Sequence, residues 1–288
     1  MGYQKDYLYQ EITVASLDEI YRAIGEYKEF YQLPRPGRNG DDPLLNVFYR
    51  GQSNKQWDIS PSLERSKVNE ADQITAYSLE DGLSLFGMIA YIQHNYTGTR
   101  FIDFTMNPDV AIYFACSENS DKDGAVFIYS YDPHKEEWYT AIVLSELTQI
   151  PTNDIITIED LSTVILRKHP EFHEKFQSIT DLNGAIVSFL DHGFMALPDE
   201  NSKQGNIRLQ RQEGCFFVCG VKFVDEEINR FFSRAGENRF YPHSAVVPDS
   251  LINGHTLVKL IIPKDCKEEM LKQVYAKGII QDYLFPKE

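Results

Sequence analysis

Apolar residues recur at helical spacing near the beginning of the chain, at Ile20, Ile24 and Tyr27. They follow the stretch SLDE, residues 16–19, in which the serine hydroxyl can accept from the third helical N–H while the glutamate reaches back to the cap. The capping box and the apolar spacing together predict a helix over residues 17–32.

The segment after this helix changes from loop chemistry to strongly apolar elements. Residues 33–43 contain three prolines and two glycines, which is typical of a loop. LLNVFYRG, residues 44–51, is apolar on both faces and predicts a strand inside a sheet. We expect a helix over residues 70–93 and an extended segment over residues 100–105.

NPDVAIYFAC, residues 107–116, predicts a buried helix. It is apolar nearly all round, and it begins with an asparagine that can cap a helix and a proline suited to the first helical position. The residues expected in the core around this helix are Phe104, Val110, Ala111, Phe114 and Ala115.

The second half of the chain mixes strands and helices without a regular alternation. We expect strands over residues 124–131 and 256–263, a strand and then a short helix over 139–150, mostly helix over 158–196, a strand over 207–220 and a helix over 264–278. This order predicts a single α+β domain with a central mixed or antiparallel sheet and surrounding helices. Its N-terminal helical segment and loop, residues 1–43, would join a main unit over residues 44–288.

Composition narrows the class of protein. The net charge of −15 argues against generic binding to nucleic-acid backbones, because such binding depends on clustered Lys and Arg. A local basic cleft remains compatible with this charge. The N-terminal sequence MGYQKDYLYQ lacks the apolar core of a signal peptide, and nowhere do about 18 apolar residues run together, so we expect a cytoplasmic protein without a membrane span.

Cysteine and histidine spacing gives little support for a metal site. The four cysteines form no C-x-x-C pair, and we expect free buried thiols, with a disulfide or a metal as the alternative. His169 and His173 have a spacing that can chelate zinc, but Pro170 lies between them and no third ligand follows at a recognised interval. We therefore expect no metal.

Arg50 is the first candidate for function, because it lies between aromatic residues and a glycine at the end of a predicted strand. Its planar guanidinium suits a phosphate or carboxylate, so Arg50 could clamp a ligand while Gly51 lets that ligand approach the backbone. The alternative is an ion pair with Asp103, whose neighbours are apolar and which needs a partner if it is buried. The two interpretations can coexist, and for Asp103 alone the structural one is favoured.

Three separated segments resemble the FRG domain family, which is named for a Phe-Arg-Gly motif. They are FYRGQSNKQWDISPSLER (48–65), QHNYTGTRFIDFTMNPDVAIYFA (93–115), and the pair formed by IRLQRQEGCFF (207–217) and the closing segment 261–286. The matching residues are Arg50, Gly51, Gln52, Trp57, Pro61, Ser62, Arg65, Gln93, His94, Thr99, Arg100, Asp103, Thr105, Asn107 and Pro108. Tyr49 replaces the Phe of the name, and Tyr96, Gly98 and Phe104 replace the Gly, Pro and Trp of the family.

The order of these segments is also similar to the layout of ADP-ribosyltransferases. That resemblance implies a cleft that holds NAD, in which an arginine bridges phosphate or ribose, a hydroxyl fixes the nicotinamide ribose and a glutamate stabilises an oxocarbenium-like transition state. Here the late strand offers Gln210 and Gln212 at the expected spacing, with Glu213 one place out of register. On a strand, Glu213 would point away from both glutamines unless a bulge at Gly214 rotates it.

The resemblance implies a set of site residues. The implied catalytic residues are Glu213, Gln212 and His94, and the implied NAD-binding residues are Arg50, Gly51, Gln52, Thr99, Arg100 and Thr105. Some of these residues also suit a purely structural role, since threonines are common in extended segments and His94 fits the end of a helix.

Two functions are compatible with these residues. The first is ADP-ribosyl transfer or NAD hydrolysis, in a bacterial defence or toxin setting, with a protein or nucleic-acid target that the sequence does not identify. The second is a non-catalytic module that binds a small anionic ligand or a protein and has lost the glutamate. The direction of Gln210, Gln212 and Glu213 relative to Arg50 distinguishes the two.

Overall fold

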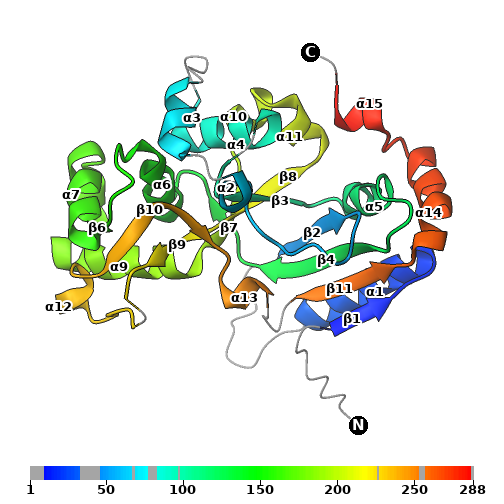
Figure 1. Ribbon diagram of the computed structural model, residues 1–288, viewed down its shortest axis with the longest axis horizontal. Coiled ribbons are helices and arrows are strands. Elements are labelled where there is room, and N and C mark those ends of the chain that lie inside the picture. The colour runs from blue at the N-terminus through cyan, green and yellow to red at the C-terminus, as the bar shows by residue number, and fades with distance from the viewer. Residues whose placement is uncertain are drawn as a thin grey trace, which may run out of the picture.

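The computed structural model describes residues 10–32, 46–66, 69–76, 83–96, 98–225, 227–252 and 257–286. The loop expected over residues 33–43 lies outside this part of the chain. The fold mixes helices with a large sheet, as the sequence predicts, and it also contains a small sheet that was not predicted (Figure 1).

The large sheet has the strand order β1–β11–β4–β2–β3–β8–β7–β5. The bounds are β1 (Gln10–Thr13), β11 (Val258–Ile262), β4 (Gly124–Tyr131), β2 (Asn46–Gln52), β3 (Phe101–Thr105), β8 (Gly214–Val218), β7 (Phe194–Leu197) and β5 (His134–Lys135). β1 pairs with β11 and β5 with β7 in parallel, and the other described pairings are antiparallel, so the sheet is mixed. The small sheet contains β6 (Ile156–Thr157), β10 (Arg239–Val246) and β9 (Gly220–Phe223).

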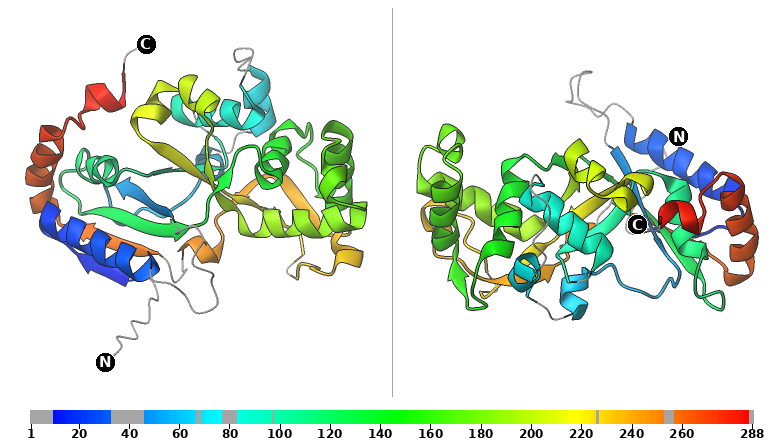
Figure 2. Two further views of the ribbon diagram at one scale, coloured as in Figure 1. Left: turned by 180° about the vertical axis from the view of Figure 1, so that it is seen from behind. Right: turned by 90° about the horizontal axis from the view of Figure 1, so that it is seen from above.

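Helices cover both ends of the molecule (Figure 2). At one end lie α1 (Leu17–Gln32), α5 (Pro108–Cys116) and α14 (Lys264–Ala276), and at the other lie α6 (Tyr139–Glu146), α7 (Ile158–Lys168), α9 (Ile179–His192) and α12 (Phe232–Ala235). The remaining helices are α2 (Ser62–Ser66), α3 (Glu70–Ala76), α4 (Leu85–Asn95), α8 (Phe172–Lys175), α10 (Glu200–Gln204), α11 (Ile207–Arg211), α13 (Asp249–Ile252), α15 (Gln281–Leu284) and a 3-10 turn (Leu147–Gln149). None of the helices in the described part of the chain is long and apolar enough to cross a membrane.

Several local predictions are confirmed. Helix α1 has the predicted bounds, and the Ser16 hydroxyl accepts from the Glu19 N–H at 3.3 Å. Asn107 caps α5 by accepting from the Asp109 N–H, with Pro108 in the first helical position. All four cysteines are free, and three are buried as predicted, whereas Cys266 is only partly buried. Short-range capping chemistry therefore fixes where these helices begin.

Two segments correct the sequence-based assignment. Residues 139–150 contain no strand: they form α6 and the 3-10 turn, and most of their side chains are buried among other helices. Residues 207–213 are also not a strand, because the Asn206 side chain caps α11 by accepting from the Leu209 N–H, and the strand β8 begins only at Gly214. The strand β7, inside the segment expected to be mostly helical, was not predicted.

Helix α5 packs against the sheet through close backbone contact. Strand β2 alternates, with Phe48 in the core on one sheet face and Tyr49 in the core on the face that holds α5. A methyl group added at Gly51 would lie 1.8 Å from the carbonyl oxygen of Ala111 in α5. Gly51 is therefore required for the close packing of α5, and it also lines the cavity that is described below.

Gly51→Ala should reduce the free energy of unfolding by about 1–3 kcal/mol, because the backbone of α5 has to move away to admit the methyl group. Chemical denaturation measures the change. Gly25→Ala is the matched control, since an added methyl meets nothing within 4 Å at Gly25. The control should raise stability by about 0.5–1 kcal/mol, as expected for alanine in a helix interior. Equal stability of Gly51→Ala and wild type would contradict the close packing of α5.

The large sheet consists of two halves, β1–β11–β4–β2 and β3–β8–β7–β5, which are joined between β2 and β3. Strand β2 pairs with β4 along its whole length, from Asn46 opposite Tyr131 to Gln52 opposite Ala125. Within the described ranges, by contrast, β2 and β3 are joined at a single register pair, Tyr49 opposite Thr105. The residues that follow Tyr49 in β2 and precede Thr105 in β3 are therefore free to face a space between the two halves.

Candidate functional site

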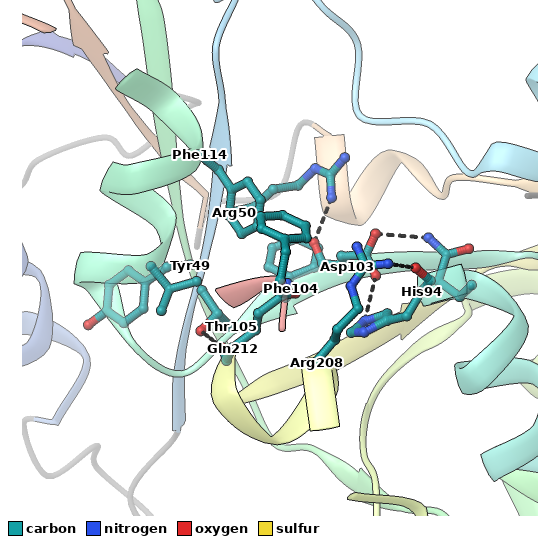
Figure 3. Close-up of a pocket in the computed structure, with 13 residues that line it drawn as sticks. Tyr49, Arg50, His94, Asp103, Phe104, Thr105, Phe114, Arg208 and Gln212 are labelled. Atoms are coloured by element: carbon teal, nitrogen blue, oxygen red, sulfur yellow. Dashed lines mark hydrogen bonds and ion pairs between the residues drawn. The ribbon is translucent and has the colours of Figure 1, made fainter. Parts of the chain in front are cut away.

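A cavity of about 230 Å³ lies where β2 and β3 meet, and we call it the inner cavity (Figure 3). Its apolar wall comes from β2, β3, α5 and the C-terminal segment, and includes Tyr49, Phe104, Val110, Phe114 and Phe285. Its polar wall includes Arg50, Gln93, His94, Asp103, Arg208 and Gln212. Phe114 lines the cavity and is only partly buried, whereas the other residues predicted to be core here are buried.

Arg50 projects into this space from β2. Its Nη1 donates to the backbone carbonyl of Asp103 at 2.6 Å, and its Nε is buried with no hydrogen-bond partner among the described residues. Burial lowers the pKa of Arg50, and the negative charge of Asp103 opposes this effect. The predicted neighbourhood of Arg50 and Asp103 is confirmed, although the direct contact is made to the carbonyl.

The Asp103 carboxylate is held by two side chains of α4. Gln93 Nε2 donates to Oδ2 at 2.8 Å, and His94 Nε2 lies 3.4 Å from Oδ1, while 46% of the Asp103 side chain remains exposed. Burial by itself would raise the pKa of Asp103, but the hydrogen bond and charge of His94, together with Arg50 and Gln93, hold this pKa below its ordinary value. Asp103 therefore presents an ionised carboxylate to the cavity at neutral pH.

A second layer of hydroxyl groups orients Gln93. Ser62 donates to Gln93 Oε1 at 3.1 Å, and the Thr99 hydroxyl donates to the same oxygen. Two donors on the amide oxygen leave the amide nitrogen free to point at Asp103. Thr99 therefore acts behind the cavity wall and does not line it.

Thr105 and Gln212 join β3 to the late part of the chain. The Thr105 hydroxyl donates to the carbonyl of Gln212 at 2.6 Å and accepts from the Asn107 N–H at 3.0 Å. The Gln212 side chain donates to the Leu284 carbonyl at 3.2 Å. Arg50, Thr105 and Gln212 thus line one cavity, as the sequence predicts, but the Thr105 hydroxyl and the Gln212 amide nitrogen already bond to protein carbonyls.

Most of the residues that line the cavity lie in a segment that matches a known family. The family model of the FRG domain matches residues 45–124. Residues 45–124 are an FRG domain. No curated protein and no solved structure matched the chain. Within the FRG domain, Arg50 is separated by more than forty residues from Gln93, His94 and Asp103, yet all four line the inner cavity.

Arg100 of the FRG domain is surrounded by protein groups that bind its side chain. Its side chain is fully buried and forms an ion pair with Glu70, to which Arg100 Nε donates at 3.0 Å. Arg100 Nη2 also donates to the Pro242 carbonyl at 2.8 Å. Arg100 does not line the inner cavity, so the structure does not bring it together with Arg50 as the resemblance implied.

Glu213 also lies apart from the FRG domain cavity. It has a left-handed backbone conformation, with φ of 46°, in the turn between α11 and β8. Its exposed carboxylate accepts from Asn107 Nδ2 at 2.7 Å, and together with Gln210 it lines a different pocket. Because residues 210–213 are not a strand, the alternation expected for them does not apply. Gln212 faces the cavity, and Glu213 does not.

Sequence reasoning missed Arg208 and Phe285, which lie outside the FRG domain match. Arg208 Nη1 donates to the His94 carbonyl, and its guanidinium lies 4.8 Å from the centroid of the Phe285 ring. Burial lowers the pKa of Arg208, and Asp103 opposes this effect. A signal was available in the sequence, because Arg208 lies in residues 207–217 and Phe285 in residues 261–286, and both segments resemble the family.

A larger space of about 990 Å³, which we call the outer groove, shares Arg50 with the inner cavity. Gln52, Trp57, Ser60 and Arg65 of the FRG domain line it. Gln52 Nε2 donates to the Asp58 carbonyl at 3.3 Å. Arg50 thus lines both spaces.

The inner cavity is lined by two guanidinium groups, one imidazole, one carboxylate and the phenol of Tyr49. Such a set can bind an anionic ligand and can also stabilise positive charge that develops next to Asp103. Among the residues that the structure describes, no group of three or more His, Cys, Asp or Glu side chains is placed to hold a metal ion.

Proposed function

We propose that this protein binds NAD across the inner cavity and the outer groove and breaks the bond between nicotinamide and ribose, which passes ADP-ribose to water or to another acceptor. One observation carries the proposal: Arg50 from β2 and Gln93, His94 and Asp103 from α4 and β3 converge on one cavity. This arrangement supplies a cation for phosphate and an ionised carboxylate for the reacting sugar.

The sizes of the two spaces suit a ligand with two parts. Ligand pockets typically measure about 300–1,000 Å³. The inner cavity, at about 230 Å³, is too small for a dinucleotide but accommodates one ring and part of a sugar. The outer groove, at about 990 Å³, has room for the remainder. Arg50 lines both spaces and is therefore placed to bind the phosphates that link the two halves of the ligand.

Asp103 provides the charge that the reaction requires. When the bond between ribose C1′ and the pyridinium nitrogen breaks, its electron pair stays on that nitrogen and nicotinamide leaves as a neutral molecule. Positive charge develops on the ribose, and a nearby carboxylate lowers the energy of this state. In hydrolysis, a water oxygen then bonds to C1′ and releases a proton to solvent. Asp103 takes the place that the resemblance had given to a late glutamate.

The test is incubation of the full chain with NAD, followed by chromatography for free nicotinamide and ADP-ribose and by calorimetry for binding. Release of nicotinamide supports the proposal. Binding of NAD without release supports the alternative of a non-catalytic binding module, which the separation of Glu213 from the cavity favours. Absence of NAD binding would refute the proposed function and would also refute NAD as the ligand of a non-catalytic module.

Arg50→Lys should weaken NAD binding about ten-fold or more, because lysine keeps the charge but loses the planar fork that can hold a phosphate at two points. Titration calorimetry measures the change. Arg22→Lys, at an exposed position of α1, is the matched control and should leave the affinity unchanged. A loss of thermal stability in Arg50→Lys without any change in NAD affinity would make Arg50 a structural residue.

A further inference from the structure

The outer groove has features that the cleavage of NAD does not by itself explain. Part of its lining is apolar, and we call this part the floor: it consists of Ile59 and of Ala245, Val246 and Val247, which lie at and just after the end of β10. Trp57 stands at its side with 48% of its surface exposed. A large aromatic side chain next to an apolar floor provides a surface on which a planar ring can stack.

Two guanidinium groups face this groove. Arg65 Nη1 donates to the carbonyl of Ser60 at 2.8 Å and to its hydroxyl at 2.9 Å, which fixes the position of Arg65. Burial is the main cause of the lowered pKa of Arg50, and the positive charge of Arg65 lowers this pKa further. Like charges near one another are favourable where an anion binds between them.

The groove also contains an unused acceptor. Gln52 is 5% exposed, and its Oε1 is buried with no hydrogen-bond partner in the described part of the chain. Buried polar atoms are normally paired, so an unpaired carbonyl at the wall of a groove suits a ligand that brings a donor. An exocyclic amino group of a nucleobase is such a donor. Asp58 and Glu64, which also line the groove, can accept from ribose hydroxyls.

We infer that the outer groove is a nucleoside-phosphate subsite, in which an amino-bearing base lies against Trp57 over the apolar floor and the phosphates lie between Arg50 and Arg65. The inference rests on the proposed function in one respect, because it assigns the groove to the adenosine half of NAD. It predicts that AMP and ADP-ribose bind without nicotinamide.

Trp57→Ala should weaken the binding of AMP and of ADP-ribose about ten-fold or more, because stacking of a base on an aromatic side chain is lost. Trp57→Phe keeps an aromatic face and should retain most of the affinity. Trp138→Ala, at the other tryptophan of the chain, which is 43% exposed, is the matched control and should bind as wild type does. Calorimetry measures each affinity, and thermal melting confirms that each variant is folded.

Fluorescence gives a direct readout of contact. In Trp138→Phe, Trp57 is the only tryptophan, and its emission should change when AMP is added and should stay unchanged when nicotinamide mononucleotide is added. If NAD is bound and cleaved but AMP neither binds nor changes this emission, the subsite is refuted and the proposed function stands. If AMP binds in a Trp57-dependent way and NAD is not cleaved, the subsite stands and the proposed function fails. Absence of any nucleotide binding refutes both.

Discussion

Asp103→Asn should slow the release of nicotinamide from NAD by about 10²–10³-fold, the effect typical of losing one preorganised electrostatic contact to a transition state. Asparagine keeps the size of the side chain and an oxygen that accepts from Gln93 Nε2, but it removes the negative charge that faces the reacting ribose. NAD affinity should change little, since the bound substrate depends mainly on Arg50. Initial rates at saturating NAD, with calorimetry for affinity, measure the two effects separately.

Asp121→Asn is the matched control for this change. Asp121 lies in an exposed ion pair with Lys122, so its neutralisation should leave both rate and affinity as in the wild type. A wild-type rate in Asp103→Asn would show that Asp103 serves only to hold His94 and Gln93 in the fold. A loss of NAD affinity as large as the loss of rate would show that Asp103 supports binding rather than the reacting sugar.

Glu70→Ala should reduce the free energy of unfolding by about 3–5 kcal/mol, because it leaves the fully buried guanidinium of Arg100 without its opposite charge. Chemical denaturation monitored by circular dichroism measures the loss. Asp121→Ala breaks an exposed ion pair instead and should leave the denaturation midpoint unchanged. If Glu70→Ala is as stable as wild type and loses NAD affinity, Arg100 acts on a ligand, as the family resemblance implied, and the structural interpretation is wrong.

The sequence predicted those parts of the fold that depend on short-range chemistry. Helix α1 follows from the capping box at residues 16–19 and its apolar spacing, and α5 follows from Asn107 and Pro108. The strands β2 and β4 follow from short runs with apolar residues on both faces. Each of these signals lies within about ten residues, so no long-range contact is required to interpret it.

Residues 207–213 show where such interpretation ends. Their alternating pattern suits a strand, but Asn206 caps a helical turn, and Glu213 takes a left-handed conformation before β8 begins. The strand predicted at the start of residues 139–150 is wrong for a similar reason. An apolar segment of this length fits a strand or a helix equally well, and burial among helices decides in favour of the helix Tyr139–Glu146. Tertiary packing overrides weak local preference in both places.

The residues of the site were also predicted only in part from the sequence. The sequence alone identified Arg50, His94 and Asp103 as residues with chemistry to offer, through charge, aromatic neighbours and a family motif. Only the tertiary structure decided that Arg50 faces a cavity while Arg100 is buried against Glu70, and that the carboxylate in that cavity comes from Asp103 rather than from Glu213. The reason is physical: the role of a charged group depends on its solvent exposure and on the charges within a few ångströms, and residues distant in the chain supply both.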